Sequence, residues 1–166
     1  MTKDAKMQED FSKDTESLLT EIAPMMKDAG RREEALERIL ALEKKARMGF
    51  DGISVSKLCC AIIQMYWDGG QDLQKINESI VILYKRRGQL KRAMIDMVRL
   101  CMDWIEKITD KKKKMDFIDG LCEVTDGKIF VEVERARLTR SKAAMLEKDG
   151  DLETAADIMQ EVQKNN

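Results

Sequence analysis

The 166-residue sequence contains no histidine, a single proline, and only 5% aromatic residues. Histidine is the commonest general base and metal ligand in proteins, so its absence removes the usual starting point for a catalytic or metal site. The four cysteines form no C-x-x-C pair, and no glycine-rich phosphate loop follows a strand-like segment. We therefore predict that the chain is not an enzyme and has no catalytic residue, bound metal or cofactor.

Long apolar segments are also missing. The longest, Leu58–Ile63, is far too short to cross a bilayer, and the charged N-terminus lacks the apolar core of a signal peptide. Most of the cysteines, which are Cys59, Cys60, Cys101 and Cys122, lie among apolar neighbours, as is typical of buried free thiols in a reducing compartment. The sequence therefore predicts a soluble intracellular protein that does not associate with membranes.

Strong helix formers are abundant. Apolar residues make up 43% of the chain and charged residues 37%. Apolar residues recur at spacings of three and four from Gln89 to Ile108, which predicts one amphipathic helix. The same reasoning, with glycines near the ends of the periodic stretches, predicts helices at 12–28, 32–48, 53–68, 72–87, 89–108, 111–124, 128–148 and 152–163.

Two segments make this assignment less simple. Pro24 lies inside the first helix, which it should kink or split, because proline lacks an N–H and clashes with the preceding turn. Ile129–Glu134 partly alternates like a strand, but helical spacing continues from Arg135 to Lys148, and a lone strand would have no partner. We therefore predict helix in both places.

A turn signature recurs along the chain. Gly30 and Gly150 each precede a few polar residues and then a new helix, and Gly70 precedes a looser copy. Such turns join the helices of tetratricopeptide-like hairpins. They predict an all-α fold, an α-solenoid of about four antiparallel helical hairpins in a right-handed, tetratricopeptide-like superhelix. This domain would span residues 12–166 after a flexible segment at 1–11, and an ordinary bundle of helical hairpins stays as the alternative.

Several stretches together resemble a known family. They are Leu40–Lys44, Lys85–Lys91, Trp104–Asp110, the long stretch Thr125–Thr139 (TDGKIFVEVERARLT), and the Asp149–Asp151 turn with Ala155 and Ala156 after it. In order and spacing they are similar to lid subunits of the proteasome regulatory particle, which belong to the proteasome-COP9-initiation-factor class. The resemblance spans residues 29–163 and does not extend to the N-terminal segment.

The resemblance implies a non-catalytic scaffold. Members of the family combine an N-terminal helical-repeat arm with a C-terminal winged-helix module, so we expect this chain to be the N-terminal part of a longer subunit, without that module. The expected partners are other lid subunits, including the deubiquitinase, and the core particle. The expected role is to support ubiquitin-dependent protein degradation in the cytoplasm and nucleus. The alternative is a free-standing helical-repeat adaptor that binds a peptide in its concave groove.

Positive charge is concentrated in one part of a chain whose net charge is only −1. From Lys85 to Lys114 there are eleven Lys or Arg and four Asp or Glu. This stretch is either a solvated surface beside helix ends or a docking patch for an acidic protein surface. The candidate contact residues are Lys85, Arg86, Arg87, Lys91, Arg92, Lys111 and Lys112. Because no aromatic residues interleave the lysines at 111–114, we predict that the chain does not bind nucleic acid.

The C-terminal helix carries a further expectation. If a solenoid is cut before its capping end, its last hydrophobic face has no neighbour. The residues that would form this face are Met145, Ile158, Met159 and Val162. We therefore expect the isolated chain to self-associate there, or its last helix to lose order.

Overall fold

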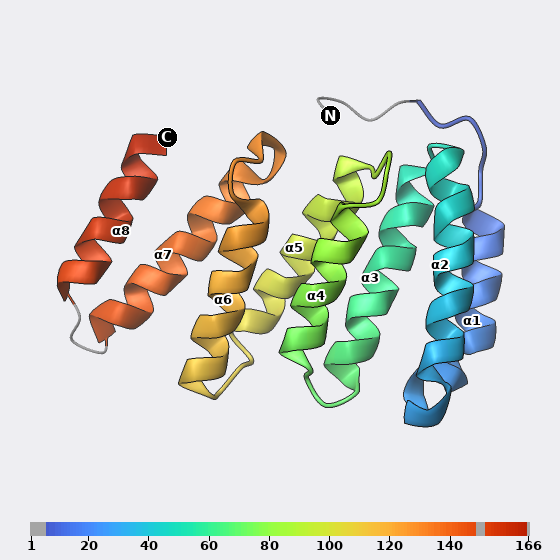
Figure 1. The fold of residues 1–166 in the computed structure, drawn as a ribbon, viewed down its shortest axis with the longest axis horizontal. Helices are drawn as coiled ribbons and strands as arrows, with labels where there is room; N and C mark the ends of the chain where they lie inside the picture. Colours follow the sequence, from blue (N-terminus) through green and yellow to red (C-terminus); the bar gives the residue numbers. More distant parts are fainter. Residues whose placement is uncertain (1–5, 149–151, 166) are drawn as a thin grey trace. The chain divides into compact units, whose positions relative to one another are not determined.

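The computed structural model describes residues 6–148 and 152–165, and the regular structure within them is helical (Figure 1). The α-helices are α1 (Ser12–Lys27), α2 (Arg32–Met48), α3 (Gly52–Asp68), α4 (Leu73–Tyr84), α5 (Lys91–Ile105), α6 (Lys111–Thr125), α7 (Glu132–Lys148) and α8 (Leu152–Asn165). Single turns of 3₁₀ helix, η1 (Ala29–Arg31) and η2 (Ile129–Val131), precede α2 and α7. The predicted all-α fold class is therefore confirmed.

The chain forms two compact units, residues 1–100 and residues 101–166, and the division falls inside α5. In the first unit, α1 packs against α2 and α3, and α3 packs against α2 and α4. In the second unit, α7 packs against both α6 and α8. Consecutive helices within each unit run antiparallel (Figure 1), so each unit is a series of helical hairpins.

The core of the first unit is built around α3, whose sequence is apolar almost all round. Its most deeply buried aliphatic residues are Val55, Leu58, Ile62 and Ile63. Burying each large aliphatic side chain contributes about 1.5–3 kcal/mol. Because neighbours cover α3 on several sides, its sequence needs no polar face. The neighbouring α2 directs Ala35, Ile39 and Ala46 into the same core.

Pro24 does not divide α1, which continues from Ser12 to Lys27 as one helix. Of the two predicted outcomes, a kink or a split, the split is therefore wrong, and the kink stays a prediction. Proline removes the N–H that would bond to the carbonyl of Thr20. Because both residues are exposed, water can satisfy that carbonyl, and the helix tolerates the loss.

Helices α4 and α5 are shorter than predicted, since they end at Tyr84 and Ile105 rather than at 87 and 108. The chain leaves the helix after Tyr84 and turns over six residues before α5 begins at Lys91. At the other end, Ile108 is buried but lies in the connection to α6. Its apolar spacing therefore extended the predicted helix beyond the true one.

The strand-like segment at 129–134 is helical, as predicted. It forms η2 and the first turn of α7. Val131 and Glu134 are buried, whereas Glu132 and Val133 are exposed, so burial follows a helical rather than an alternating pattern. The core of this second unit also contains Phe117, Ile118 and Leu121 from α6, with Leu138 from α7.

Two of the three predicted turns can be seen. Gly30 lies in η1, where its N–H donates to the Asp28 carboxylate at 3.0 Å, and Gly70 lies between α3 and α4. The third, at Gly150, lies outside the described residues. Among the helices of the described part, none is both long and apolar enough to span a membrane.

Candidate functional site

The α4–α5 connection carries most of the predicted contact residues, and one side chain shapes it. Gly88 has φ +74°, a left-handed conformation that side chains rarely allow, and it redirects the chain after Arg87. Gln89 then folds back: its amide nitrogen donates to the Leu83 carbonyl at 2.9 Å, and its amide oxygen accepts the Leu90 N–H at 2.9 Å. Gln89 thus satisfies a carbonyl at the end of α4 and an N–H before α5.

A buried ion pair on α2 holds this connection. Glu43 is only 1% exposed, and its Oε1 lies 2.9 Å from Nε of Arg47, one helical turn away. The same oxygen accepts a hydrogen bond from Gln89 Nε2 at 3.1 Å. Arg47 Nη1 donates to the Arg87 carbonyl at 2.5 Å. Buried charges must be paired and hydrogen-bonded, and here the partners come from both elements, so α2 and the connection are fixed to each other.

The α2–α3 turn is held by a second buried carboxylate, that of Asp51. It accepts the Ser54 N–H at 3.1 Å, the Ser54 hydroxyl at 2.6 Å and the Phe11 N–H at 2.7 Å. A Cβ on Gly49 would lie 2.9 Å from Phe11 Cε2 and 2.9 Å from Glu9 Cβ, so a larger residue there would displace the N-terminal segment. The end of the N-terminal segment is therefore attached to this turn, whereas residues 1–5 lie outside the described part.

The two turns lie side by side. A Cβ placed on Gly52 would lie 3.7 Å from Leu90 Cδ1 and 3.8 Å from Arg92 Cδ. We call residues 43–57 and 85–92 together the basic double turn. It consists of two chain reversals, and the buried side chains of Glu43 and Gln89 join its two halves.

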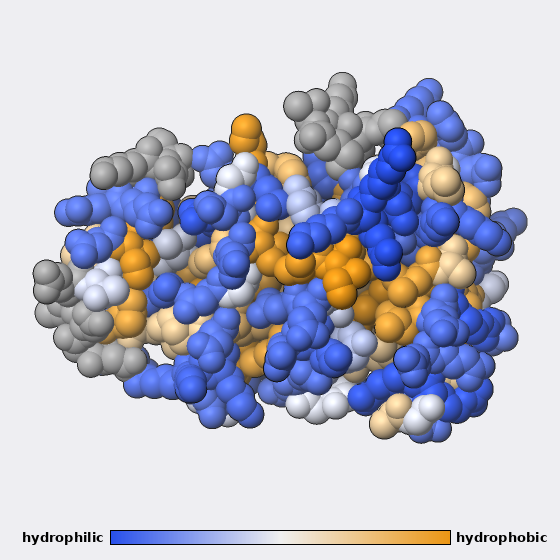
Figure 2. Space-filling view, viewed as in Figure 1, coloured by the Kyte–Doolittle hydropathy of each residue, from blue (hydrophilic) through white to orange (hydrophobic). Residues whose placement is uncertain are grey.

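The structure brings five of the seven predicted contact residues together on the basic double turn. These are Lys85, Arg86, Arg87, Lys91 and Arg92. All are exposed except Lys91, which is half-buried, and a deep-blue patch of Figure 2 lies over this connection. The other two, Lys111 and Lys112, are exposed in the first turn of α6, in the second unit. Cations there oppose the helix dipole, and the Asp110 carboxylate, which accepts the Lys113 N–H at 3.0 Å, begins the helix.

The sequence analysis did not find Glu43 and Gln89, which fix the shape of the site. Glu43 falls four residues after the buried Ile39, within the apolar stripe of α2. An acid in such a stripe indicates a buried pair, and this signal could have been used. Gln89 gives no comparable signal, because its three hydrogen bonds depend on elements that meet only in the folded chain.

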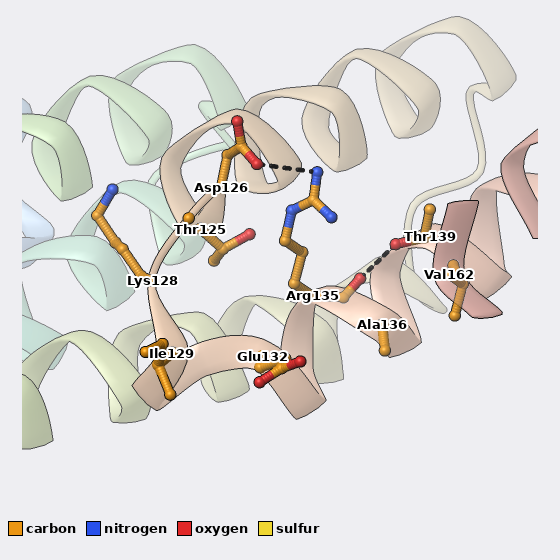
Figure 3. A pocket seen from close by; sticks show the side chains of 10 residues that line it. Thr125, Asp126, Lys128, Ile129, Glu132, Arg135, Ala136, Thr139 and Val162 are labelled. Carbon is orange, nitrogen blue, oxygen red and sulfur yellow. Dashed lines mark hydrogen bonds and ion pairs between the residues drawn. The ribbon is translucent and has the colours of Figure 1, made fainter. Parts of the chain in front are cut away.

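A second candidate is a pocket of about 270 Å³ between the α6–α7 connection, α7 and α8 (Figure 3). Arg135 Nη2 lies 3.3 Å from Asp126 Oδ1, and Arg135 Nε is buried without a hydrogen-bond partner among the described residues. The hydroxyls of Thr125 and Thr139 donate to carbonyls of their own helices, at 2.8 and 2.6 Å. Ile129, at the rim, is 86% exposed. The pocket therefore holds no activated nucleophile, and its surroundings suit a protein contact.

The cysteines are free, as predicted. Burial raises the pKa of the Cys60 thiol from 9.0 to about 11, and the nearby Asp96 carboxylate adds to the rise. Burial also raises the pKa of Cys59 and of Cys122. Since the thiolate is the reactive form, these three groups are poor nucleophiles at neutral pH. No group of side chains in the described residues is arranged to hold a metal ion.

Comparison with known proteins identifies the family. Residues 34–165 match the family described as PSMD12/CSN4, N-terminal. The 26S proteasome non-ATPase regulatory subunit 12 of Dictyostelium discoideum is 41% identical over 162 residues, which cover 98% of this chain and 36% of that protein.

Two further relatives agree. The 26S proteasome non-ATPase regulatory subunit 12 homolog A of Arabidopsis thaliana is 39% identical over 137 residues, covering 82% of this chain and 31% of that protein. The 26S proteasome regulatory subunit RPN5 of Saccharomyces cerevisiae is 32% identical over 172 aligned positions, covering 98% and 37%. This chain thus spans about a third of the length of the curated relatives it matches. The chain with the basic double turn belongs to the PSMD12/CSN4 N-terminal family, which confirms the resemblance found in its sequence.

Proposed function

We propose that the chain is the helical-repeat part of a non-catalytic scaffold subunit in the lid of the proteasome regulatory particle. The observation that carries the proposal is the match to proteins named as 26S proteasome regulatory subunits, which covers 98% of this chain in two relatives. In this role the chain contacts other lid subunits and the core particle, and so supports ubiquitin-dependent protein degradation. Its proposed location is the cytoplasm and nucleus.

The antiparallel hairpins of each unit support the finer architecture that we propose. This is an α-solenoid of about four hairpins in a tetratricopeptide-like, right-handed superhelix, spanning residues 12–166 after the segment 1–11. A solenoid presents its turns in rows along its edges, where neighbouring subunits can reach them. Turn residues are therefore the natural contacts of such a scaffold.

The proposed contacts of the scaffold are the basic residues at two helix starts and turns. They are Lys85, Arg86, Arg87, Lys91, Arg92, Lys111 and Lys112. Six of them are exposed. Electrostatic complementarity at such sites sets the orientation and speed of encounter with a partner more than the final affinity.

The scaffold proposal can be tested by co-purification. The affinity-tagged chain would be co-expressed with the lid subunits of the same organism, and the captured complex analysed by native mass spectrometry. We expect a stoichiometric set of lid subunits. Recovery of the chain without them, together with tight binding of isolated peptides, would favour the adaptor instead.

We also propose that the isolated chain self-associates through its last two helices. Met145, Ile158 and Met159 are half-buried and would form the contact, whereas Val162 is buried, so its predicted place in this exposed face is wrong. Light scattering should then give a mass above that of the monomer, or hydrogen exchange should show weak protection in α8. A monomer with full protection in α8 would contradict this proposal.

A further inference from the structure

Charge is segregated in the basic double turn. Its residues include nine Lys or Arg and only two acids, Glu43 and Asp51. Both carboxylates are buried and hydrogen-bonded inside the fold. Six cations are exposed and form no ion pair with the described residues: Lys44, Lys45, Lys57, Lys85, Arg86 and Arg87. The outer surface is therefore positive, and its own acids do not neutralise it.

Apolar side chains accompany these cations at helical spacing. Met48 is 68% exposed and lies four residues after Lys44 on α2, and Ile53 is 52% exposed and lies four residues before Lys57 on α3. Residues four apart share a helix face, so each apolar side chain has a cation one turn away. A third exposed apolar residue, Ile82 on α4, is 54% exposed and precedes the basic residues of the α4–α5 connection by one turn.

The surface is also held in one shape. The bonds of Arg47 to the Arg87 carbonyl and of Gln89 to Glu43 join the two turns beneath the cations. A prearranged surface loses less conformational entropy when it binds than a mobile one. The positions of the exposed cations relative to Met48 and Ile53 are thus set before any partner arrives.

The pattern favours a polypeptide over a nucleic acid. Single-stranded nucleic acids are usually bound by cations together with aromatic rings on which bases stack. Within the basic double turn, the large apolar side chains that are more than half exposed, Met48 and Ile53, are not aromatic, and its one aromatic residue, Phe50, is half-buried. Aliphatic groups beside cations match a helix or extended segment that carries carboxylates beside apolar side chains.

We infer that the basic double turn binds an acidic polypeptide segment whose carboxylates flank one or more apolar side chains. The cations meet the carboxylates, and Met48 and Ile53 meet the apolar groups. This inference rests on the proposed scaffold function, because it describes the surface through which a neighbouring subunit would be held. It adds the chemistry of that neighbour and the contribution of the α2–α3 turn.

The direct test uses the full chain and a synthetic helical peptide with Glu residues one turn from Leu residues. Fluorescence anisotropy would measure its binding at low and high salt. We expect binding that weakens with salt, and a loss of affinity of about tenfold in the triple variant Lys44→Glu, Lys57→Glu, Lys85→Glu. The matched control, Lys27→Glu, Lys107→Glu, Lys148→Glu, makes the same change of charge at exposed lysines elsewhere and should bind nearly as the parent does.

A second pair of variants tests the contribution of the exposed apolar side chains to peptide binding. Met48→Ser with Ile53→Ser should weaken binding of the same peptide several-fold. Ile129→Ser with Val133→Ser, which removes two exposed apolar side chains from the second unit, should leave it unchanged. Equal affinity for a counterpart peptide with Lys in place of Glu would overturn the inference. Tighter binding of a single-stranded oligonucleotide of equal charge would do so as well.

A carbodiimide, which joins lysine amines directly to carboxylates, separates this inference from the scaffold proposal. In the co-purified lid complex we expect Lys44, Lys57 or Lys85 to be joined to Asp or Glu of a neighbouring subunit. If the complex forms but these lysines stay uncoupled, the inference fails and the scaffold proposal stands. If no complex forms while the acidic peptide binds as described, the scaffold proposal fails and the surface chemistry stands.

Discussion

The α4–α5 and α6–α7 connections are stabilised in different ways. Each must reverse the chain between two antiparallel helices. In the first, buried Glu43 and Gln89 hold the turn from within the fold. In the second, the Asp126–Arg135 ion pair lies at the surface beside a pocket, and Asp126 is mostly exposed.

The difference shows that buried polar groups stabilise the conformation of a turn strongly, whereas solvated polar groups contribute little to its stability. A surface ion pair contributes at most about 1 kcal/mol, because water and salt screen it. A buried pair that loses one partner costs several times more, because a charge is left without compensation. The four predictions that follow test this contrast, from the largest expected effect to the smallest.

The largest effect is expected for Glu43→Ala. The substitution leaves Arg47 nearly buried without its carboxylate and removes an acceptor from Gln89. We expect the free energy of unfolding to fall by about 3–5 kcal/mol, as measured by urea denaturation followed by circular dichroism. A loss no greater than that of an exposed ion pair would show that the network is not buried in solution.

A smaller loss is expected for Asp51→Ala, since Asp51 caps α3 and also holds the Phe11 N–H. We expect roughly 1–3 kcal/mol, together with faster hydrogen exchange at the Phe11 amide. The matched control is Asp110→Ala at the start of α6, where the exposed carboxylate accepts the Lys113 N–H. Equal losses for the two caps would remove the contrast between the units.

The cysteines extend the comparison to pH. The pKa of Cys60 rises from 9.0 to about 11 on folding because the thiol is buried. The buried neutral thiol therefore costs the folded state nothing below pH 9, where Cys60 is neutral in both states. As pH rises from 9 toward 11, the thiol ionises first in the unfolded chain, so the folded state loses stability relative to the unfolded one. We expect the free energy of unfolding to fall by roughly 1–2 kcal/mol more across this window in the parent chain than in Cys60→Ala. Parallel pH profiles would contradict the assignment.

The smallest effect is expected for Asp126→Ala, which removes the ion pair with Arg135 beside the pocket. Because Asp126 is mostly exposed, the loss should stay below about 1 kcal/mol and shrink further at high salt. Urea denaturation at two salt concentrations would measure it. A loss that matched that of Glu43→Ala would show that the α6–α7 connection is as firmly fixed as the α4–α5 one.

The positions of the helices could be predicted from the sequence, whereas the arrangement of the candidate site could not. Periodicity located the helices because each buries one apolar stripe, and the ends of α1, α2 and α3 lie within one residue of those predicted. It overextended α4 at its end and α5 at its start, because charged residues that suit a helix form the turn at 85–90 instead. It also placed the end of α5 too late, because the buried Ile108 lies in the connection to α6.

The charges themselves were visible in the sequence, but their surroundings were not. Nothing in the local pattern relates Lys85 to Met48 or Ile53, which are more than thirty residues earlier in the chain. The α2–α3 turn, which contains those residues, comes near the α4–α5 connection only because the turns of two hairpins meet near Gly52. Long-range contacts of this kind need the folded structure.

The contact between the two turns depends on a single atom, the side-chain amide nitrogen of Gln89. Its amide nitrogen faces both a carboxylate oxygen of Glu43 and the Leu83 carbonyl. Deamidation would replace that nitrogen with oxygen, and three acceptors would then face one another without a proton between them. Spontaneous deamidation of this one glutamine would thus weaken the attachment of the α4–α5 connection to α2, and the bond from Arg47 to the Arg87 carbonyl would be left to hold it.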